Sequence, residues 1–185
     1  MSTRETEIRL LTSSSGMPPE QFKQLFPLIR DWIGQTLAAH AEQAKPVASL
    51  NFPRLPHYYS HELLAQAKVV FVDKCPVPPL GAFGLTQFAE FENMSIAGIT
   101  YLDTYFALWY EAELEALHFH ELVHVIQWQW LGPERFLALY ANGLEQYGYR
   151  HSPLEVMAYN HEAQFKSGQP VYSVEAAVRE QLKRL

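Results

Sequence analysis

The chain has a single cysteine among its 185 residues. One cysteine forms no disulfide within the chain, and scarcity of cysteine is typical of a reducing compartment, so we expect a cytoplasmic protein. No apolar run approaches the ~18 to 20 residues that a membrane-spanning helix needs. Residues 1–16 are polar and charged, with no apolar segment followed by a small-residue cleavage site, so no secretory signal is expected.

Basic residues are also few. The chain carries 14 Lys and Arg against 20 Asp and Glu, a formal net charge of −6, and no cluster of cations that could follow a phosphate backbone. This balance excludes a nucleic-acid partner. Hydrophobic residues make up 48% of the chain, which is enough to bury one sizeable core. We therefore predict one domain over residues 17–185, preceded by a flexible N-terminal segment, residues 1–16.

The most informative motif is an HExxH pattern at His120, Glu121 and His124. Random placement of the chain's 8 His and 17 Glu would produce it roughly 0.03 times. Positions i and i+4 of a helix share one face, so both imidazoles can bind a single Zn²⁺. Glu121 would then flank the metal and take a proton from a zinc-bound water, whose pKa the metal lowers toward neutrality. The pattern predicts a water-activating zinc site.

The residues around the motif favour a helix. The run 111–131 lacks Gly and Pro, and three glutamates lie near its N-terminal end, where the helix dipole favours negative charge. Gly132 and Pro133 follow at once, which is a typical stop signal. The alternative is a buried amphipathic helix whose histidines are ordinary core residues.

A catalytic zinc site needs a third protein ligand and an open fourth position. The metzincin pattern would place a glycine three residues after His124 and a histidine six residues after it. The chain has Gln127 and Trp130 at these positions, which excludes that pattern. Residues 152–165 are instead typical of a second helix, with Pro153 at its first position.

Glu155, in the first turn of this second helix, is the leading candidate for the third ligand, because a carboxylate on a neighbouring helix commonly completes a zinc site. The small side chain of Ala158 would let the two helices approach closely. Alternatively, Ser152 as N-cap and Glu155 form a capping box, in which the glutamate bonds to the N-cap amide and touches no metal. The other candidate ligands are Glu162, His151, His161 and Glu145.

The segments 120–127 and 153–159 resemble the gluzincin class of zinc metallopeptidases, in particular small bacterial HExxH proteins in which a glutamate on a following helix completes the site. The resemblance covers about residues 95–166. It implies a zincin-like fold, with Glu155 as third ligand and the motif glutamate as general base. Thermolysin-like gluzincins carry an aspartate four residues after the ligand glutamate, which orients a zinc-bound histidine. This chain has Tyr159 there, so the partners of the ligands must differ.

The order of predicted elements indicates an α+β fold, with a small mixed sheet packed on the metal-binding helix and further helices C-terminal to it. Helices are predicted at 18–44, 62–67, 111–131, 134–146, 153–166 and 174–184, and strands at 69–72, 86–92 and 96–101. An extension of the last strand through 108 is the alternative. By the zincin resemblance, segment 98–103 is an edge strand to which a peptide substrate adds as a further strand. A plain edge strand without a ligand is the alternative.

Amide hydrolysis also needs a donor for the oxyanion that develops at the attacked carbonyl. Tyr149 is the first candidate, and the others are Tyr147, Arg150, His151 and Tyr159. A packing or surface role is the favoured alternative for each of them, because most of the ten tyrosines must be structural.

Three further residues near the motif have structural interpretations. His118 lies two positions before His120, which turns it away from the ligand face by about 200°. Trp128 and Trp130 are interpreted as packing residues rather than as parts of a substrate pocket.

Cys75 raises a further hypothesis, that its thiolate occupies the open zinc position and keeps the enzyme latent. A lone cysteine is more often packed and inert.

These observations predict a zinc-dependent hydrolase, a metallopeptidase that cleaves peptide bonds of a peptide or protein substrate. The alternative from another class is a zincin-like domain that binds zinc for structure or partner recognition and catalyses nothing. Hydrolysis of a non-peptide amide or ester would use the same residues. The choice of zinc follows from the ligand types, although two imidazoles and a carboxylate also hold other divalent transition metals.

Overall fold

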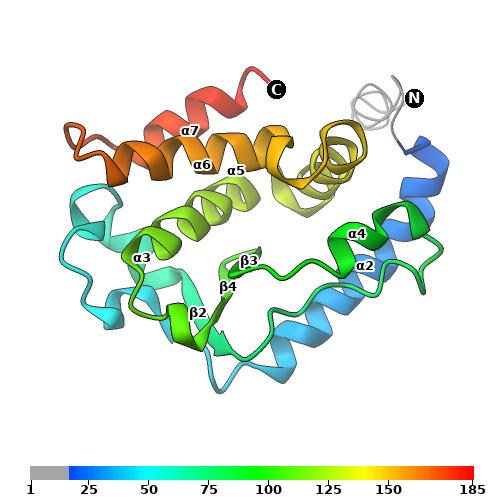
Figure 1. Ribbon diagram of the computed structural model, residues 1–185, viewed down its shortest axis with the longest axis horizontal. Coiled ribbons are helices and arrows are strands. Elements are labelled where there is room, and N and C mark those ends of the chain that lie inside the picture. Colours follow the sequence, from blue (N-terminus) through cyan, green and yellow to red (C-terminus); the bar gives the residue numbers. More distant parts are fainter. Residues whose placement is uncertain (1–16) are drawn as a thin grey trace.

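A computed structural model describes residues 17–185, and the predicted flexible segment 1–16 lies outside the described residues. The helices are α2 (Pro19–Ala39), α3 (His61–Gln66), α4 (Ala89–Glu92), α5 (Glu115–Tyr147), α6 (Pro153–Lys166) and α7 (Val174–Leu182), and the strands are β1 (Lys45–Pro46), β2 (Lys68–Val72), β3 (Gly98–Tyr101) and β4 (Thr104–Leu108) (Figure 1). This arrangement confirms the α+β class. Over residues 17–185, no helix combines the length and the apolar character needed to cross a membrane.

The four strands form one mixed sheet in the order β1-β2-β4-β3. Strands β2 and β4 run parallel, with Val70 opposite Phe106, whereas β1 and β3 pair antiparallel to their neighbours. Segment 98–101 is therefore an edge strand, as predicted. In Figure 1, α5 lies between the sheet and α6, so the helix that carries the HExxH motif is covered on both sides.

Buried side chains fall into two hydrophobic clusters. The larger one joins the sheet to the first part of α5 and to α6 and α7, and all five residues of β4 are buried in the fold. The second cluster is smaller and lies among α2, the 80–91 segment and the last part of α5. Its buried members are Met17, Phe22, Leu25, Leu80, Leu85, Phe88, Phe91 and Ala138.

Helix α5 bends sharply at Gly132, whose backbone has φ 73° and ψ 164°, a conformation that a glycine adopts without steric cost. Pro133 follows and lacks the amide hydrogen that a continuous helix would use. The two predicted helices at 111–131 and 134–146 are thus the two arms of α5. The first arm begins at Glu115 because residues 109–111 form a 3₁₀ turn.

The predicted strand at 86–92 is wrong. Residues 86–88 form a 3₁₀ turn that leads directly into α4. The apolar residues Leu85, Phe88 and Phe91 recur every third position, so they all reach the second cluster only from a helical backbone.

Two further boundaries differ from the prediction. The strand expected from 96 toward 108 is a hairpin, because the chain reverses at Leu102, which has φ 60°, and Asp103. The first helix ends at Ala39 rather than near residue 44. There the His40 ring bonds to the Thr36 carbonyl at 2.8 Å and packs edge-on against Phe106, which stops the helix at the sheet.

Phe165 holds the last turn of α6 against α5. Its ring is 1% exposed, stacks on Phe119 with centroids 4.5 Å apart, and carries the Arg54 guanidinium over its other side at 3.7 Å. Phe165→Ala should lower the free energy of unfolding by about 3–5 kcal/mol, measured by urea denaturation, because it leaves a cavity in the core. The control Val156→Ala, at an exposed position of the same helix, should change it by about 0.5 kcal/mol or less. Equal midpoints of urea denaturation for the two variants would contradict the role of Phe165 in the core.

Candidate metal centre

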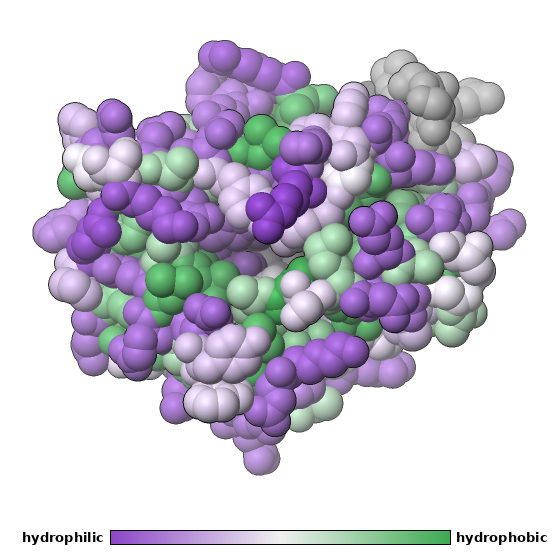
Figure 2. All heavy atoms as spheres, in the orientation of Figure 1, coloured by the Kyte–Doolittle hydropathy of each residue, from purple (hydrophilic) through white to green (hydrophobic). Residues whose placement is uncertain are grey.

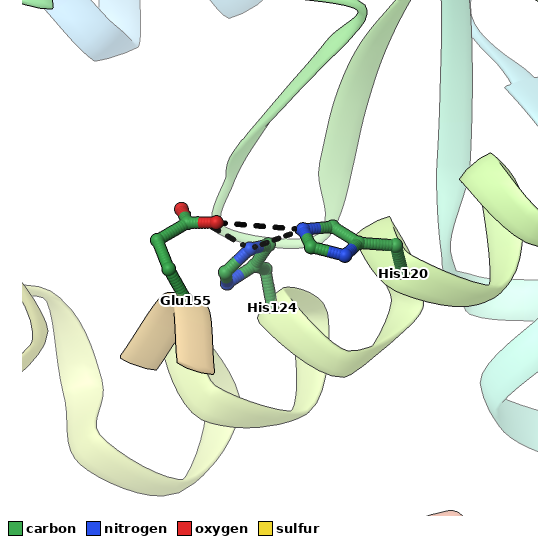
Figure 3. Close-up of side chains that lie close together, drawn as sticks. All are labelled: His120, His124 and Glu155. Atoms are coloured by element: carbon green, nitrogen blue, oxygen red, sulfur yellow. Dashed lines mark hydrogen bonds and ion pairs between the residues drawn. The ribbon is translucent and has the colours of Figure 1, made fainter. Parts of the chain in front are cut away.

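Three potential ligands converge between α5 and α6. The Nε2 atoms of His120 and His124 lie 3.2 Å apart, and the Glu155 carboxylate lies 3.5 Å from the first and 3.4 Å from the second (Figure 3). The three side chains are 5%, 5% and 2% exposed, and their ligand atoms all lie within 4.8 Å of one another. His120, His124 and Glu155 are thus close enough to bind one metal ion.

Hydrogen bonds on the far side of each imidazole orient its lone pair toward this point. His124 Nδ1 bonds to the Gln127 side-chain oxygen at 2.8 Å, and the Gln127 amide donates to the Leu154 carbonyl at 3.0 Å. His120 Nδ1 bonds to the Glu162 carboxylate at 3.1 Å. Because both partners accept, each ring directs its Nδ1–H away from the cluster and its Nε2 atom toward the other ring. A cation between the two Nε2 atoms, either a metal ion or a proton on His120, would bind to both.

The Glu155 carboxylate also needs a cation as a partner. The Tyr140 hydroxyl donates to its Oε1 at 2.8 Å, but its Oε2 is buried without a hydrogen-bond partner. A buried carboxylate oxygen left unpaired is costly. The donor set, two imidazole nitrogens and a carboxylate oxygen, is one that divalent zinc prefers. The residues present therefore fit a metal ion on their own chemistry.

The pKa values of His120 and Glu155 also favour a positive charge at this point. Burial alone would lower the pKa of His120, but the neighbouring Glu155 and Glu162 carboxylates outweigh burial and raise that pKa to about 10. Burial likewise acts to raise the pKa of Glu155, and the two histidines overcome it and hold that pKa well below its usual range. The cluster thus favours positive charge among its carboxylates, which a divalent cation supplies in full.

Glu121 lies beside the cluster and is 3% exposed. The Thr100 hydroxyl donates to its carboxylate at 2.7 Å, and the Trp128 indole donates to the Thr100 carbonyl at 3.0 Å, which ties β3 to α5. A Cβ at Gly98 would overlap the Glu121 carboxyl group, so glycine leaves the space in which this carboxylate lies. Burial raises the pKa of Glu121, partly offset by the two histidines and by the Thr100 hydrogen bond.

The capping-box alternative for Glu155 does not hold. Ser152 is the N-cap of α6 and Pro153 its first residue, as predicted. However, the Ser152 amide bonds to the Tyr149 carbonyl at 3.2 Å, and Glu155 turns toward the histidines instead.

The other candidate ligands lie outside the cluster. Glu162 bonds to Nδ1 of His120, on the side of the ring that faces away from the cluster, and so supplies the orienting carboxylate that Tyr159 cannot supply. The Tyr159 ring packs against the His120 imidazole, with centroids 4.6 Å apart. The remaining candidates are an exposed His151, an exposed Glu145, and His161, which is hydrogen-bonded to Tyr172 and Gln181.

Cys75 also lies outside the cluster. Its thiol donates to the Phe106 carbonyl at 3.7 Å, and burial, together with the nearby Glu121 carboxylate, raises its pKa to about 12. This geometry contradicts the latch hypothesis, which needs a thiolate among the ligands. His118 is held away from the cluster, between the Tyr105 hydroxyl at 2.6 Å and the Ala112 carbonyl at 2.8 Å.

A cavity of about 90 Å³ adjoins the cluster, and Glu121, His124 and Glu155 form part of its wall. Trp128 stacks on Phe136 with centroids 3.9 Å apart, the packing role predicted for it, and it lines this cavity as well. The other tryptophan, Trp130, is 44% exposed.

Sequence reasoning missed two polar partners of the site. Thr100 and Tyr140 are 21 and 15 residues from the carboxylates they bond, and no local pattern marks either one. The role of Gln127 could have been predicted, because it lies three residues after His124 on the same helix face.

Comparison with protein-family models, with curated proteins and with solved structures yields no match to this chain. The reading of the site therefore rests on its own geometry.

We expect the purified protein to bind about one divalent metal ion per chain, measured by elemental mass spectrometry after zinc reconstitution and dialysis. Glu155→Ala should lose the ion, because it removes a ligand and leaves two imidazoles. Glu162→Ala should keep the ion with about 10- to 100-fold weaker affinity, because it removes only the partner of His120.

Glu145→Ala, at an exposed glutamate, is the matched control and should bind as the wild type does. Full metal content in Glu155→Ala together with loss in Glu162→Ala would reverse the two roles.

Proposed function

We propose that this chain is a zinc-dependent hydrolase that cleaves amide bonds in the manner of a metallopeptidase, within a zincin-like fold. The observation that carries the proposal is the buried His120, His124 and Glu155 cluster, with the Glu121 carboxylate held beside it in the wall of a cavity. Two imidazoles and one carboxylate are the ligand set of several catalytic zinc sites.

Zinc bound to this set would lower the pKa of a water molecule and polarise the scissile carbonyl. Glu121 accepts a proton from the attacking water and returns it to the departing nitrogen, so the carbon–nitrogen bond breaks as a carbon–oxygen bond forms. Thr100 holds one oxygen of Glu121 during both transfers. Tyr140 and the two imidazole partners, Gln127 and Glu162, keep the ligands in place.

Two features support a catalytic rather than a structural site. Structural zinc sites are closed by four protein ligands, whereas in the described part of the chain only three His, Cys, Asp or Glu side chains meet here. In addition, Gly98 and Thr100 give Glu121 a fixed place. A structural site has no use for such a carboxylate.

Glu121→Gln tests the proposal directly. It should keep about one zinc ion per chain and lower turnover by at least about 10²-fold, because the amide cannot accept the proton. Turnover is measured with quenched fluorescent peptides and with N-acyl amino acids. Glu145→Gln is the matched control and should retain wild-type turnover. Wild-type turnover in Glu121→Gln would contradict the assigned role. Stoichiometric zinc without turnover of either substrate pool would favour the alternative, a zincin-like domain that binds zinc for structure or partner recognition.

Tyr149 is the donor we assign to the developing oxyanion. It lines the cavity together with Glu121 and Glu155, whereas Tyr147 is 55% exposed. Burial and the nearby Glu155 carboxylate raise the pKa of Tyr149 far above its usual range, so the phenol keeps its proton. Tyr149→Phe should lower kcat by about 10²-fold with little change in KM. Tyr147→Phe is the control. An unchanged kcat in Tyr149→Phe would remove this residue from the mechanism.

A further inference from the structure

Residues of both hydrophobic clusters line the cavity beside the metal cluster. Phe22, Leu25 and Phe88 belong to the second cluster, and Ile96 and Phe136 belong to the larger one. Protein interiors are packed densely, and an apolar void within one lowers stability. Its retention next to a metal cluster indicates a space kept for a ligand.

The lining of the cavity extends along α2. Phe22, Leu25, Ile29 and Ile33, at one face of this helix, all line it. These four residues are spread over 11 steps of the helix, from 22 to 33, or about 16 Å at 1.5 Å per residue. No amino-acid side chain reaches that far. An extended hydrocarbon chain matches this length.

The polar lining is gathered at the metal cluster. Glu121, His124 and Glu155 line the cavity together with Tyr140, which donates to Glu155, and Tyr149. Nearly all of the remaining lining is aliphatic or aromatic. On the face shown in Figure 2, a hollow near the centre has hydrophobic residues beside and below it and hydrophilic residues above it. A ligand that matches this wall has its reactive polar group at one end and hydrocarbon along the rest.

The edge of the sheet, by contrast, is partly closed to an added peptide strand. The Thr100 carbonyl of edge strand β3 accepts the Trp128 indole N–H at 3.0 Å, so it is not free for a substrate amide. A peptide lying along β3 would lose this hydrogen bond of the ladder.

We propose that the substrate is a long-chain N-acyl amine, with its straight hydrocarbon chain in the cavity and its amide carbonyl at the cluster. This assignment rests on the proposed hydrolase function for its chemistry. The oxygen of water forms a bond to the acyl carbon, the carbon–nitrogen bond breaks, and a proton passes through Glu121 to the nitrogen. The products are a long-chain carboxylic acid and an amine, with no change in oxidation state.

The test is binding to the full chain without zinc, measured by titration calorimetry with N-acylglycines from acetyl through hexanoyl to dodecanoyl. Affinity should rise about fourfold for each methylene that enters the cavity, up to the length of the cavity. Ala141→Phe, which places a ring in the cavity wall, should lower dodecanoyl affinity at least tenfold and leave acetyl affinity unchanged. Ala39→Phe, at an exposed position at the end of α2, is the matched control. Circular dichroism checks that both variants fold.

Wild-type affinity that stops rising beyond the hexanoyl chain would overturn the assignment and indicate a pocket for a single peptide side chain. Dodecanoyl affinity unaffected by Ala141→Phe in a folded variant would also overturn it. The binding measurement involves neither zinc nor turnover. Chain-length-dependent binding without hydrolysis would therefore support the cavity assignment and oppose the hydrolase, whereas peptide hydrolysis without chain-length-dependent binding would remove only the acyl substrate.

Discussion

The buried carboxylate of Glu155 is the group on which the rest of the site depends. It lies 2% exposed between α5 and α6, opposite two imidazole nitrogens and near the Glu121 carboxylate. Removing a carboxylate from water is tolerated only with compensating charge and hydrogen bonds. The surrounding groups supply one hydrogen bond, from Tyr140, and the histidines supply charge when they bind a proton or a metal ion. The interface between the two helices therefore has a place for a cation.

That requirement explains features of the fold that lie far from the ligands. The kink at Gly132 redirects the second arm of α5, so that Tyr140 reaches Glu155 and Phe136 stacks on Trp128. A straight helix would carry both residues away along the axis of the first arm. Ala158 is fully buried where α6 meets α5, and its small side chain permits the close approach that the prediction required. Packing and metal binding thus depend on the same contacts.

The sequence predicted the parts of the site that follow from helix periodicity. The spacing of His120 and His124, the stop at Gly132 and the start of α6 at Pro153 are local properties of the chain, and the structure has them as expected. Glu155 was preferred among several carboxylates on the basis of helix geometry, and the structure brings it to the histidines. Thr100 and Tyr140 could not be predicted, because only the tertiary packing of β3 and of the kinked helix brings them near their partners.

The errors in the strands have a related cause. The 86–92 segment was predicted as a strand, but the period of three of its apolar residues suits a helix that covers one side of a cavity. The cavity itself joins α2, this segment and the second arm of α5, which are distant in the sequence and individually resemble ordinary core elements. In the proposed enzyme, substrate length would be set by the space between these walls, and the chemistry by residues within α5 and α6. The motif alone leads to the proposed reaction class, whereas the proposed substrate depends on how the fold packs beside it.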